Sequence, residues 1–363
     1  MMFLKKHLKK VIYKNRKIRK LRQFLNFAPY ILSNKPRLVV FIIPFGDILN
    51  GGVLSINNFY KSSKKKLSNS TVVLATPKNA ENFIKFTKFN NDSFIFNSRL
   101  FFLFLRFKKI KEVIFHVPEY YLKQFMDNDF KDNRSVFSKK KLIVNVLNQK
   151  NDEMYSPKTF KEYKGKYGNI FTITCAHKQY ANQKTKEKYN IPCHHLSVYL
   201  DESNYPKKAF DQKENIILLS PDNHENKKEI IKILKDELPF FTFITINKIT
   251  FEDYKELVSK SKFQITFGEG LDGYFIEPYF CKSIGLSVYN EEFFTSNYQS
   301  LKTVYPSYKE LKRNIVNDIL ELSNNKSKYE STWEKGFSVC VKDYNAKNFE
   351  KNVTDYYNKK YNV

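Results

Sequence analysis

The 363-residue sequence is poor in cysteine and in long apolar runs, and each shortage excludes a class of protein. It contains four cysteines: Cys175, Cys193, Cys281 and Cys340. They show no metal or disulfide spacing, which favours a reducing compartment. No stretch reaches the roughly eighteen apolar residues of a membrane span, and the opening Met-Met-Phe-Leu is too short for a signal-peptide core. We therefore expect a cytoplasmic protein without a spanning helix.

Acidic residues are missing from the beginning of the chain, where basic residues are concentrated. Residues 1–37 contain twelve lysines and arginines, and the first acidic residue is Asp47. Apolar residues recur between the cations at helical spacing: Leu4, Leu8, Val11, Ile12, Ile18, Leu21 and Leu25. The pattern predicts a basic amphipathic arm over residues 1–34. Because such helices bind anionic lipid headgroups, we expect residues 1–37 to place the protein on the inner face of the cytoplasmic membrane.

Two other interpretations of the arm stay open. The helix could pack on its own domain by its apolar stripe and leave its cations in solvent. It could also bind nucleic acid, for which the formal charge of +26 is sufficient. No recognition fold or aromatic stacking pattern follows the arm, so we expect no nucleic-acid partner.

The length suits two domains, and 42% hydrophobic residues can form their cores. Strands are expected where short apolar runs alternate with helical patterns: 37–44, 71–76, 112–116, 141–147, 170–176, 196–200, 215–220, 241–246 and 303–305. This order predicts two doubly wound α/β domains, 35–201 and 214–340. Residues 202–213 are polar and contain proline, which is typical of a linker. Residues 341–363 hold a final helix.

Residues 264–288 form the most informative stretch. They predict a strand, a turn through Gly268, Gly270 and Gly273, a helix, and a second strand that begins near Gly285. Glu269 and Glu277 flank the turn with seven residues between them, so both can face the crevice at the carboxyl ends of the strands. A helix amino terminus stabilises a diphosphate, and a carboxylate accepts hydrogen bonds from vicinal hydroxyls. A purely structural turn is the alternative.

The stretch resembles the donor-site segment of retaining GT-B glycosyltransferases. That segment has a Glu-Gly turn, a second Glu eight positions after the first, and a small-residue helix that ends in Cys/Ala-Gly before a strand. The matching positions here are Glu269, Gly270, Glu277, Cys281 and Gly285. The family usually has Phe-Gly-Leu-Pro after Glu-Gly, where this chain has Leu271-Asp272-Gly273-Tyr274. The resemblance implies a GT-B architecture: two Rossmann-like doubly wound domains face each other across a cleft, and the last helix crosses back to the first domain.

The resemblance also implies roles for individual residues. Glu277 would hold the nucleotide ribose, and Glu269 would contact hydroxyls of the transferred sugar as a catalytic-site residue. Gly270, Leu271, Asp272 and Gly273 would line the donor phosphates. In the first domain, Gly51 and Gly52 correspond to a glycine loop beside the donor, or form an ordinary βα turn. His116 is the candidate for a second contact to the sugar, unless it is satisfied within the structure.

Neutralisation of the diphosphate is the weakest part of the match. The family has an Arg and then a Lys after the first strand of the second domain. This chain has Asp222, Asn223 and His224 in that loop, followed by Lys227. His224 or Lys227 could supply the positive charge. Lys248 follows the next strand, where a nucleotide base often rests.

The implied reaction moves a sugar from a nucleotide-sugar donor to a hydroxyl of a glycan or lipid-linked acceptor, with retention at the anomeric carbon. The setting would be synthesis of a bacterial surface polysaccharide such as capsule or lipopolysaccharide. The departing phosphate would accept the acceptor's proton, so no metal and no cofactor are expected. The rival is a non-catalytic GT-B-like subunit that binds a partner glycosyltransferase or a glycan. The missing loop arginine favours the rival, whereas Glu269 and Glu277 disfavour it.

Overall fold

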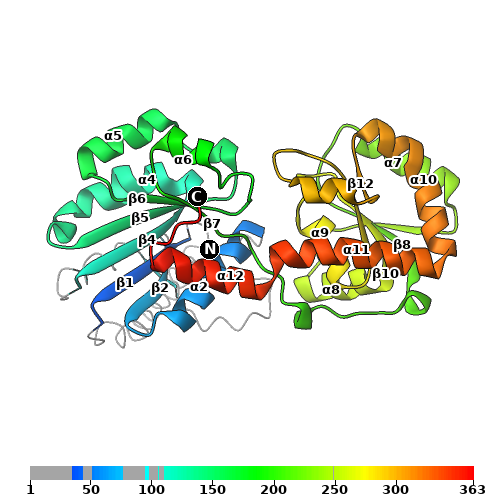
Figure 1. The fold of residues 1–363 in the computed structure, drawn as a ribbon, viewed down its shortest axis with the longest axis horizontal. Coiled ribbons are helices and arrows are strands. Elements are labelled where there is room, and N and C mark those ends of the chain that lie inside the picture. Colours follow the sequence, from blue (N-terminus) through cyan, green and yellow to red (C-terminus); the bar gives the residue numbers. More distant parts are fainter. Residues whose placement is uncertain (1–34, 44–50, 77–94, 98–104, 106–109, 248) are drawn as a thin grey trace, which may run out of the picture. The chain divides into compact units, whose positions relative to one another are not determined.

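The computed structural model describes residues 35–43, 51–76, 95–97, 105, 110–247 and 249–363. The predicted arm and Lys248 lie outside these residues. The chain forms two compact units (Figure 1). The first comprises residues up to Thr174 together with Gln183–His194 and Val363, and the second comprises Cys175–Asn182 and His195–Asn362. Among the described residues, no helix combines the length and the apolar character needed to cross a bilayer.

The first unit is built on a seven-stranded sheet of order β3-β2-β1-β4-β5-β6-β7. Its strands are β1 (Arg37–Ile42), β2 (Ser70–Thr76), β3 (Ile95–Asn97), β4 (Glu112–Pro118), β5 (Lys141–Asn148), β6 (Phe171–Cys175) and β7 (Cys193–His195). β1 pairs in parallel with both β2 and β4. From β1 the chain adds β2 and β3 on one side and β4 to β7 on the other, so the switch point of the strand order lies between β1 and β4. A doubly wound sheet binds ligands at such a point, outside the carboxyl ends of its strands.

Helices cover both faces of this sheet, which is why β1 is a continuous apolar run buried along its length. α2 (Gly51–Lys66) lies on one face, and α5 (Pro157–Tyr167) and α6 (Gln183–Tyr189) lie on the other (Figure 1). Residues 119–137 form short turns that include α4 (Leu122–Gln124). α5 begins at Ser156, whose side chain accepts a hydrogen bond from the Thr159 amide.

The second unit is built on a five-stranded sheet of order β12-β11-β10-β8-β9. Its strands are β8 (Glu214–Leu219), β9 (Thr242–Thr245), β10 (Ser261–Ile265), β11 (Ile284–Val288) and β12 (Val304–Tyr305). β8 pairs in parallel with both β9 and β10. Since the chain runs from β8 to β9 and then returns to β10 on the other side of β8, the switch point of this sheet lies between β8 and β10.

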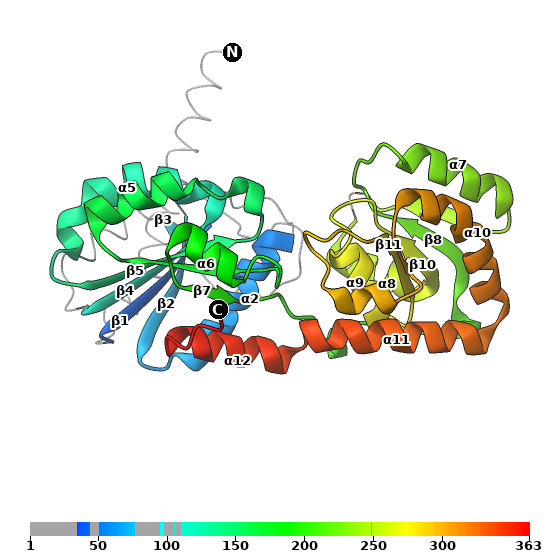
Figure 2. The same cartoon turned by 45° about the horizontal axis from the view of Figure 1, so that its top comes forward.

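The helices of the second unit also divide between the two faces (Figure 2). α7 (Lys227–Glu237) and α10 (Tyr308–Asn324) lie side by side on one face, while α8 (Phe251–Lys260) and α9 (Gly273–Phe280) lie on the other. α11 (Lys326–Tyr344) and α12 (Ala346–Tyr357) follow. The core is formed by aliphatic and aromatic side chains of β8, β10, β11, α7 and α10.

Several elements differ from the sequence-based expectations, and β3, β7 and α5 were not predicted. The strand predicted over 196–200 is wrong, because these residues are irregular and the last strand of the first sheet is β7. α11 was not predicted. It contains Gly336, serine and valine, which are poor helix formers, and packing on α9 stabilises it instead. The Trp333 indole donates to the carbonyl of Tyr279 over 2.7 Å, and a Cβ at Gly336 would lie 2.0 Å from the Tyr279 ring.

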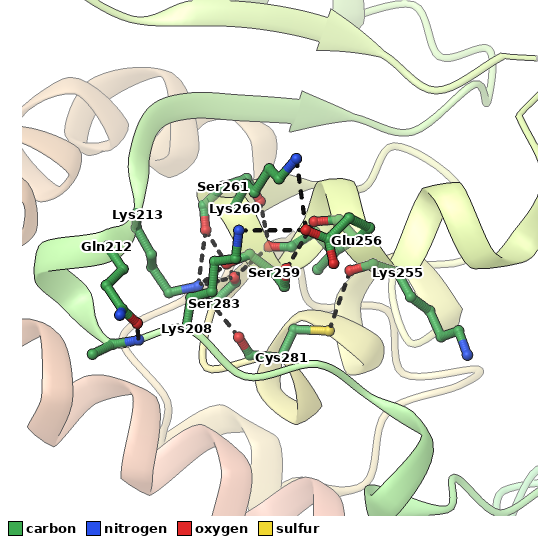
Figure 3. Close-up of polar contacts among 12 residues, drawn as sticks. Lys208, Gln212, Lys213, Lys255, Glu256, Ser259, Lys260, Ser261, Cys281 and Ser283 are labelled. Carbon is green, nitrogen blue, oxygen red and sulfur yellow. Dashed lines mark hydrogen bonds and ion pairs between the residues drawn. The ribbon is translucent and has the colours of Figure 1, made fainter.

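A buried lysine connects the start of β8 with the connections from α8 to β10 and from α9 to β11 (Figure 3). Lys213 is only 8% exposed and precedes β8. Its ammonium donates to the carbonyls of Ser259, Ser261 and Cys281 at 2.8, 3.2 and 3.3 Å and to the hydroxyl of Ser283 at 2.8 Å. Burial lowers the pKa of Lys213 to about 7. The four acceptors compensate for the hydration that the ammonium group loses on burial. Because two acceptors belong to the α8–β10 connection and two to the α9–β11 connection, Lys213 ties both connections to the start of β8.

Close packing of α9 on β11 depends on a glycine. A Cβ at Gly285 would lie 2.2 Å from the carbonyl oxygen of Phe275 in α9, a distance that no real contact allows. The obstacle is backbone, which a side-chain rotation cannot remove. The sequence-based expectation of a small residue at this position therefore has a steric cause.

We predict that Gly285→Ala lowers the free energy of unfolding by about 1–3 kcal/mol, because the added methyl group separates α9 from β11. The measurement is urea unfolding followed by fluorescence of Trp333, the single tryptophan of the chain. The matched control is Gly165→Ala in α5, where no described atom lies within 4 Å of the new Cβ. We expect it to stabilise the first unit by roughly 0.5–1 kcal/mol in circular dichroism. Equal stability of Gly285→Ala and the parent would contradict the packing argument.

Candidate functional site

The predicted donor segment lies at the switch point of the second sheet. β10 ends at Ile265, the turn Thr266–Asp272 follows, and α9 begins at Gly273. Asp222 lies in the loop after the neighbouring strand β8. The carboxyl ends of β8 and β10 thus bring the predicted turn and the loop before α7 to one edge of the sheet.

The path of the turn requires glycine at position 270. Gly270 has φ +89°, which is left-handed backbone that other residues rarely adopt. A Cβ there would lie 2.8 Å from both the Phe294 ring and the carbonyl oxygen of Val288. The Ser287 hydroxyl donates to the Gly270 carbonyl over 3.0 Å. The Glu-Gly pair singled out in the sequence therefore has a conformational reason for its glycine.

Asp272 caps the amino terminus of α9. Its Oδ1 accepts from the Phe275 amide at 3.1 Å, and its Oδ2 accepts from the Thr266 hydroxyl at 2.7 Å. Burial raises the pKa of Asp272 to about 7, and the negative charges of Asp222 and Glu269 add to the shift. The Asp272 side chain, which the resemblance predicts to line the donor phosphates, thus accepts the hydrogen bond of an amide in the first turn of α9.

Glu277 lies one turn into α9 and is held by two tyrosines. Its Oε1 accepts from the Tyr205 hydroxyl at 3.1 Å, and Tyr254 donates a second hydrogen bond. Tyr254 is in turn bonded to the Gln264 amide at 3.0 Å. Burial raises the pKa of Glu277 to about 7, although both tyrosines favour the charged form. This carboxyl group is therefore positioned in advance and stays close to protonation at neutral pH.

The other residues of the turn have different exposures. Glu269 is partly exposed and near enough to Asp272 to act on it electrostatically. Leu271 is buried in the unit. A Cβ at Gly273 would lie 3.5 Å from the Glu277 carboxyl carbon, so the two residues are neighbours on the helix. Glu269, Asp272 and Glu277 thus form one acidic edge of the turn.

The two candidates for phosphate neutralisation lie in the loop after β8. Lys227 donates to the carbonyls of Ser220 and Asp222 at 2.6 and 2.8 Å, so its ammonium is directed at the end of β8. The His224 ring stacks on Tyr308 with centroids 4.0 Å apart, and its Nδ1 accepts from the Asn226 amide. Both side chains are near the turn, and both have partners within the unit.

His116 is placed differently from a residue that contacts a ligand. Its side chain is fully buried in β4, stacked on Phe41 at 4.3 Å and edge-on to Phe59 at 4.6 Å. Nδ1 lies 2.9 Å from the Asn145 amide nitrogen, which also donates to Thr174. Burial lowers the pKa of His116 to about 3, so the ring stays neutral. The position supports the alternative in which this histidine is satisfied within the structure.

Gly51 and Gly52 form the first turn of α2, beside the switch point of the first sheet. The Gly52 carbonyl accepts from the Gln149 side chain at 2.9 Å. Glu119, which the sequence patterns did not single out, follows β4 and accepts from the amides of Gln149 and Lys150 at 3.0 and 2.9 Å. Burial raises its pKa to about 7. No short-range pattern identifies Glu119, because its neighbours come from another strand end.

Tyr205, Tyr254 and Asp222 are the other site residues that the sequence patterns missed. Tyr205 lies in the segment predicted as a linker, and Tyr254 lies on α8, so neither is near Glu277 in the chain. Asp222 stands out in the sequence only as a departure from the expected arginine. Among the described residues, no group of three or more His, Cys, Asp or Glu side chains is arranged to hold a metal ion.

The comparisons with known proteins show the fold. No protein-family model matches the chain, and no curated protein matches its sequence. Solved structures match it over nearly their whole lengths. An α-glucosyltransferase in complex with UDP and a 13-mer DNA has a TM-score of 0.57 at 13% identity, covering 88% of this chain and 98% of that chain. Sucrose-phosphate synthase from Thermosynechococcus elongatus has 0.57 at 8%, covering 89% and 98%.

A TarM variant from S. aureus, in complex with fondaparinux, α-GlcNAc-glycerol and UDP, has a TM-score of 0.54 at 10% identity. The match covers 90% of this chain and 100% of that chain. The chain therefore has the GT-B fold, which confirms the predicted fold class. At these identities the likeness concerns the fold alone.

We predict that Glu277 makes stability fall as pH rises from about 4.5 to about 7. Its raised pKa means that the native state binds more protons than the unfolded state in this window, so deprotonation favours unfolding. Glu277→Gln removes this titration. Relative to that variant, the wild type should lose roughly 1–3 kcal/mol across the window in urea unfolding followed by Trp333 fluorescence.

Tyr205→Phe provides the matched comparison for this prediction. It removes a donor to the charged carboxylate, so it should move the transition to higher pH while Glu277 remains. Parallel stability curves for the wild type and Glu277→Gln from pH 4.5 to 7 would show that the carboxyl group is not desolvated as described.

Proposed function

We propose that the chain is a glycosyltransferase that takes a sugar from a nucleotide diphosphate donor bound at the carboxyl ends of β8 and β10. The single observation that carries this proposal is the position of Glu269 and Glu277 on the turn and first helix turn after β10, at the switch point of a GT-B domain. The UDP present in the structures of the α-glucosyltransferase and of TarM supports a nucleotide-sugar donor.

The chemistry of the site suits recognition of hydroxyl groups. Glu277 is oriented by Tyr205 and Tyr254 and has acceptor capacity left for the vicinal hydroxyls of a ribose. Glu269 is partly exposed on the turn and can accept from hydroxyls of the transferred sugar. Two carboxylates near each other also occur in glycoside hydrolases. Their place beside a helix amino terminus favours binding of a donor over hydrolysis.

We infer a reaction with retention at the anomeric carbon. The bond between the anomeric carbon and the diphosphate breaks, and a bond forms between that carbon and the acceptor oxygen on the same face. The departing phosphate oxygen takes the proton of the acceptor hydroxyl, so charge and atoms balance without a protein base. The protein would contribute by positioning the donor and by stabilising the diphosphate.

The acceptor proposed is a glycan or a lipid-linked intermediate of a bacterial surface polysaccharide. The complex of TarM with α-GlcNAc-glycerol is consistent with an acceptor of this kind. The basic arm of residues 1–34 motivates a lipid-linked acceptor, because twelve cations in residues 1–37 favour the surface of an anionic leaflet. The protein would then work at the inner face of the cytoplasmic membrane.

The rival function is a non-catalytic GT-B-like subunit that binds a partner glycosyltransferase or a glycan. The observation that favours it is the charge beside the proposed donor phosphates. Asp222 and Asp272 lie there, and the loop after β8 has no arginine. Like charges oppose binding of a diphosphate unless something neutralises them.

We predict that one nucleotide diphosphate binds selectively and that Glu277→Ala weakens this binding about 10–100-fold, which corresponds to loss of a hydrogen bond to a charged group. The measurement is ligand-detected NMR titration with UDP, GDP, dTDP and CMP. The control is Glu256→Ala on α8, whose carboxylate forms ion pairs with Lys208 and Lys260. It should bind as the wild type does.

Each outcome separates the two functions. Selective binding that Glu277→Ala weakens and Glu256→Ala preserves supports the donor site. Selective binding of CMP would replace the diphosphate donor by a CMP-sugar. Failure of all four nucleotides to bind the wild type would favour the non-catalytic subunit. Glu277→Gln keeps the volume of the side chain and replaces the alanine variant if the latter does not fold.

We predict that the arm binds anionic membranes. Replacing Lys5, Lys6, Lys9 and Lys10 by glutamine should lower the partition coefficient for vesicles of about 30% phosphatidylserine by about 100–1,000-fold in co-sedimentation, since each cation near the surface contributes about 1 kcal/mol. The matched control replaces four lysines of α5: Lys158, Lys161, Lys164 and Lys166. Equal co-sedimentation of the arm variant and the wild type would contradict membrane binding through the arm.

A further inference from the structure

Two carboxyl groups, one from the loop after β8 and one from the turn after β10, lie near the exposed backbone of Gly268. A Cβ built on Gly268 would lie 2.9 Å from Cγ and 3.0 Å from Oδ2 of Asp222, and 3.2 Å from Oδ2 of Asp272. Gly268 itself is exposed. The two carboxyl groups, one from each strand of the switch point, therefore flank the point at which a ligand would approach the backbone.

The partners of the two carboxyl groups differ. Both oxygens of Asp272 accept hydrogen bonds, from the Thr266 hydroxyl and the Phe275 amide. Oδ2 of Asp222 is buried, and among the residues that the structure describes no donor reaches it. Among the described residues, the negative charge of Asp222 therefore lies beside Asp272 without a hydrogen-bond donor at Oδ2.

The positive charge near the pair is small. Lys227 is the nearby ammonium, and its hydrogen bonds go to the backbone carbonyls of Ser220 and Asp222. The other titratable groups that act on Asp222 or Asp272, or are acted on by them, carry negative charge or none: Glu269, Glu277, Tyr274, Tyr308 and Tyr344. An incoming diphosphate would therefore meet a net negative charge.

We infer that Asp222 and Asp272 determine the charge of the ligand that this site binds, so that a nucleotide diphosphate binds together with one proton, which Asp272 takes up beside the negative charge of Asp222. The inference rests on the proposed function, because it assigns the donor to the same turn. Protonation removes one negative charge next to the phosphates. It leaves Asp272 able to cap α9, because its carbonyl oxygen still accepts a hydrogen bond.

The proton is available in the physiological range. Burial and the charge of Asp222 raise the pKa of Asp272 to about 7. The negative charge of Asp222 opposes ionisation of Asp272, so the proton is assigned to Asp272. A diphosphate nearby stabilises the protonated form of Asp272 further. By linkage, affinity is full at low pH and falls as pH rises through this value, by up to about tenfold per pH unit for one proton.

The test is calorimetric titration of the full chain with UDP-glucose in EDTA, at about pH 6, 7 and 8. This probe lacks the terminal phosphate that titrates near pH 6 in UDP. At pH 8, two buffers of different ionisation enthalpy report the number of protons taken up. For the wild type we expect about fivefold weaker binding at pH 8 than at pH 7, with uptake of about one proton at pH 8.

Asp272→Asn should bind about tenfold more tightly than the wild type at pH 8, with little dependence on pH and no proton uptake. Asparagine caps a helix as well as aspartate does, so α9 keeps its start. Asp222→Asn, which caps no helix, should behave in the same way and serves if Asp272→Asn does not fold. The control is Asp253→Asn in the first turn of α8, which should keep the wild-type pH dependence.

Four results would overturn the inference. Equal affinity at all three pH values without proton uptake would overturn it and leave the proposed function intact. Weaker binding by both asparagine variants at pH 8 would show that the carboxylates contribute hydrogen bonds instead. Binding at pH 8 that magnesium restores without proton uptake would assign the pair to a cation. No binding of UDP-glucose by any protein would overturn the proton linkage together with a UDP donor, and the nucleotide titration then decides the function separately.

Discussion

The candidate site depends on a backbone constraint at the end of β10. The chain can reverse there only because Gly270 adopts a left-handed conformation beneath Phe294 and Val288. Asp272 then starts α9 by accepting from the Phe275 amide. These two features place Glu269 on the turn and Glu277 one turn into the helix. A different path at position 270 would move both carboxylates away from the switch point.

The rest of the second unit packs around the segments that flank this turn, and burial of its carboxyl groups disfavours their charged forms. Lys213 links the far ends of the same segments through four acceptors, and α11 packs on the outside of α9 through Trp333. Carboxyl groups held in such a packed frame lose hydration, which raises the pKa of both Asp272 and Glu277 to about 7. Groups with pKa values shifted toward neutrality are typical of binding and catalytic sites. In this molecule the burial that accompanies the positioning of Asp272 and Glu277 also brings their pKa values close to neutral pH.

The GT-B fold narrows the possible functions without choosing among them. Structures that share it with this chain are 8–13% identical in sequence, so the conserved quantity is the arrangement of strands and helices. A transferase and a binding subunit can be built on the same arrangement. The charge at the end of β8 bears on this choice, because Asp222, Asn223 and His224 occupy the loop in which the resembling family has an arginine. The net charge of +26 belongs to the chain as a whole and does not extend to this edge of the sheet.

The sequence by itself determined the fold class, the position of the turn that carries Glu269 and most of the strands. Buried parallel strands are continuous apolar runs, and glycines mark turns, so both features are written locally in the chain. Only the tertiary structure decided the partners of the site. Tyr205 and Tyr254 meet Glu277 across distant elements, Asp222 meets Asp272 across two strand ends, and the stacking partners of His116 come from another strand and helix. Such contacts depend on which strands are neighbours in the sheet, and a local pattern of residues does not predict that order.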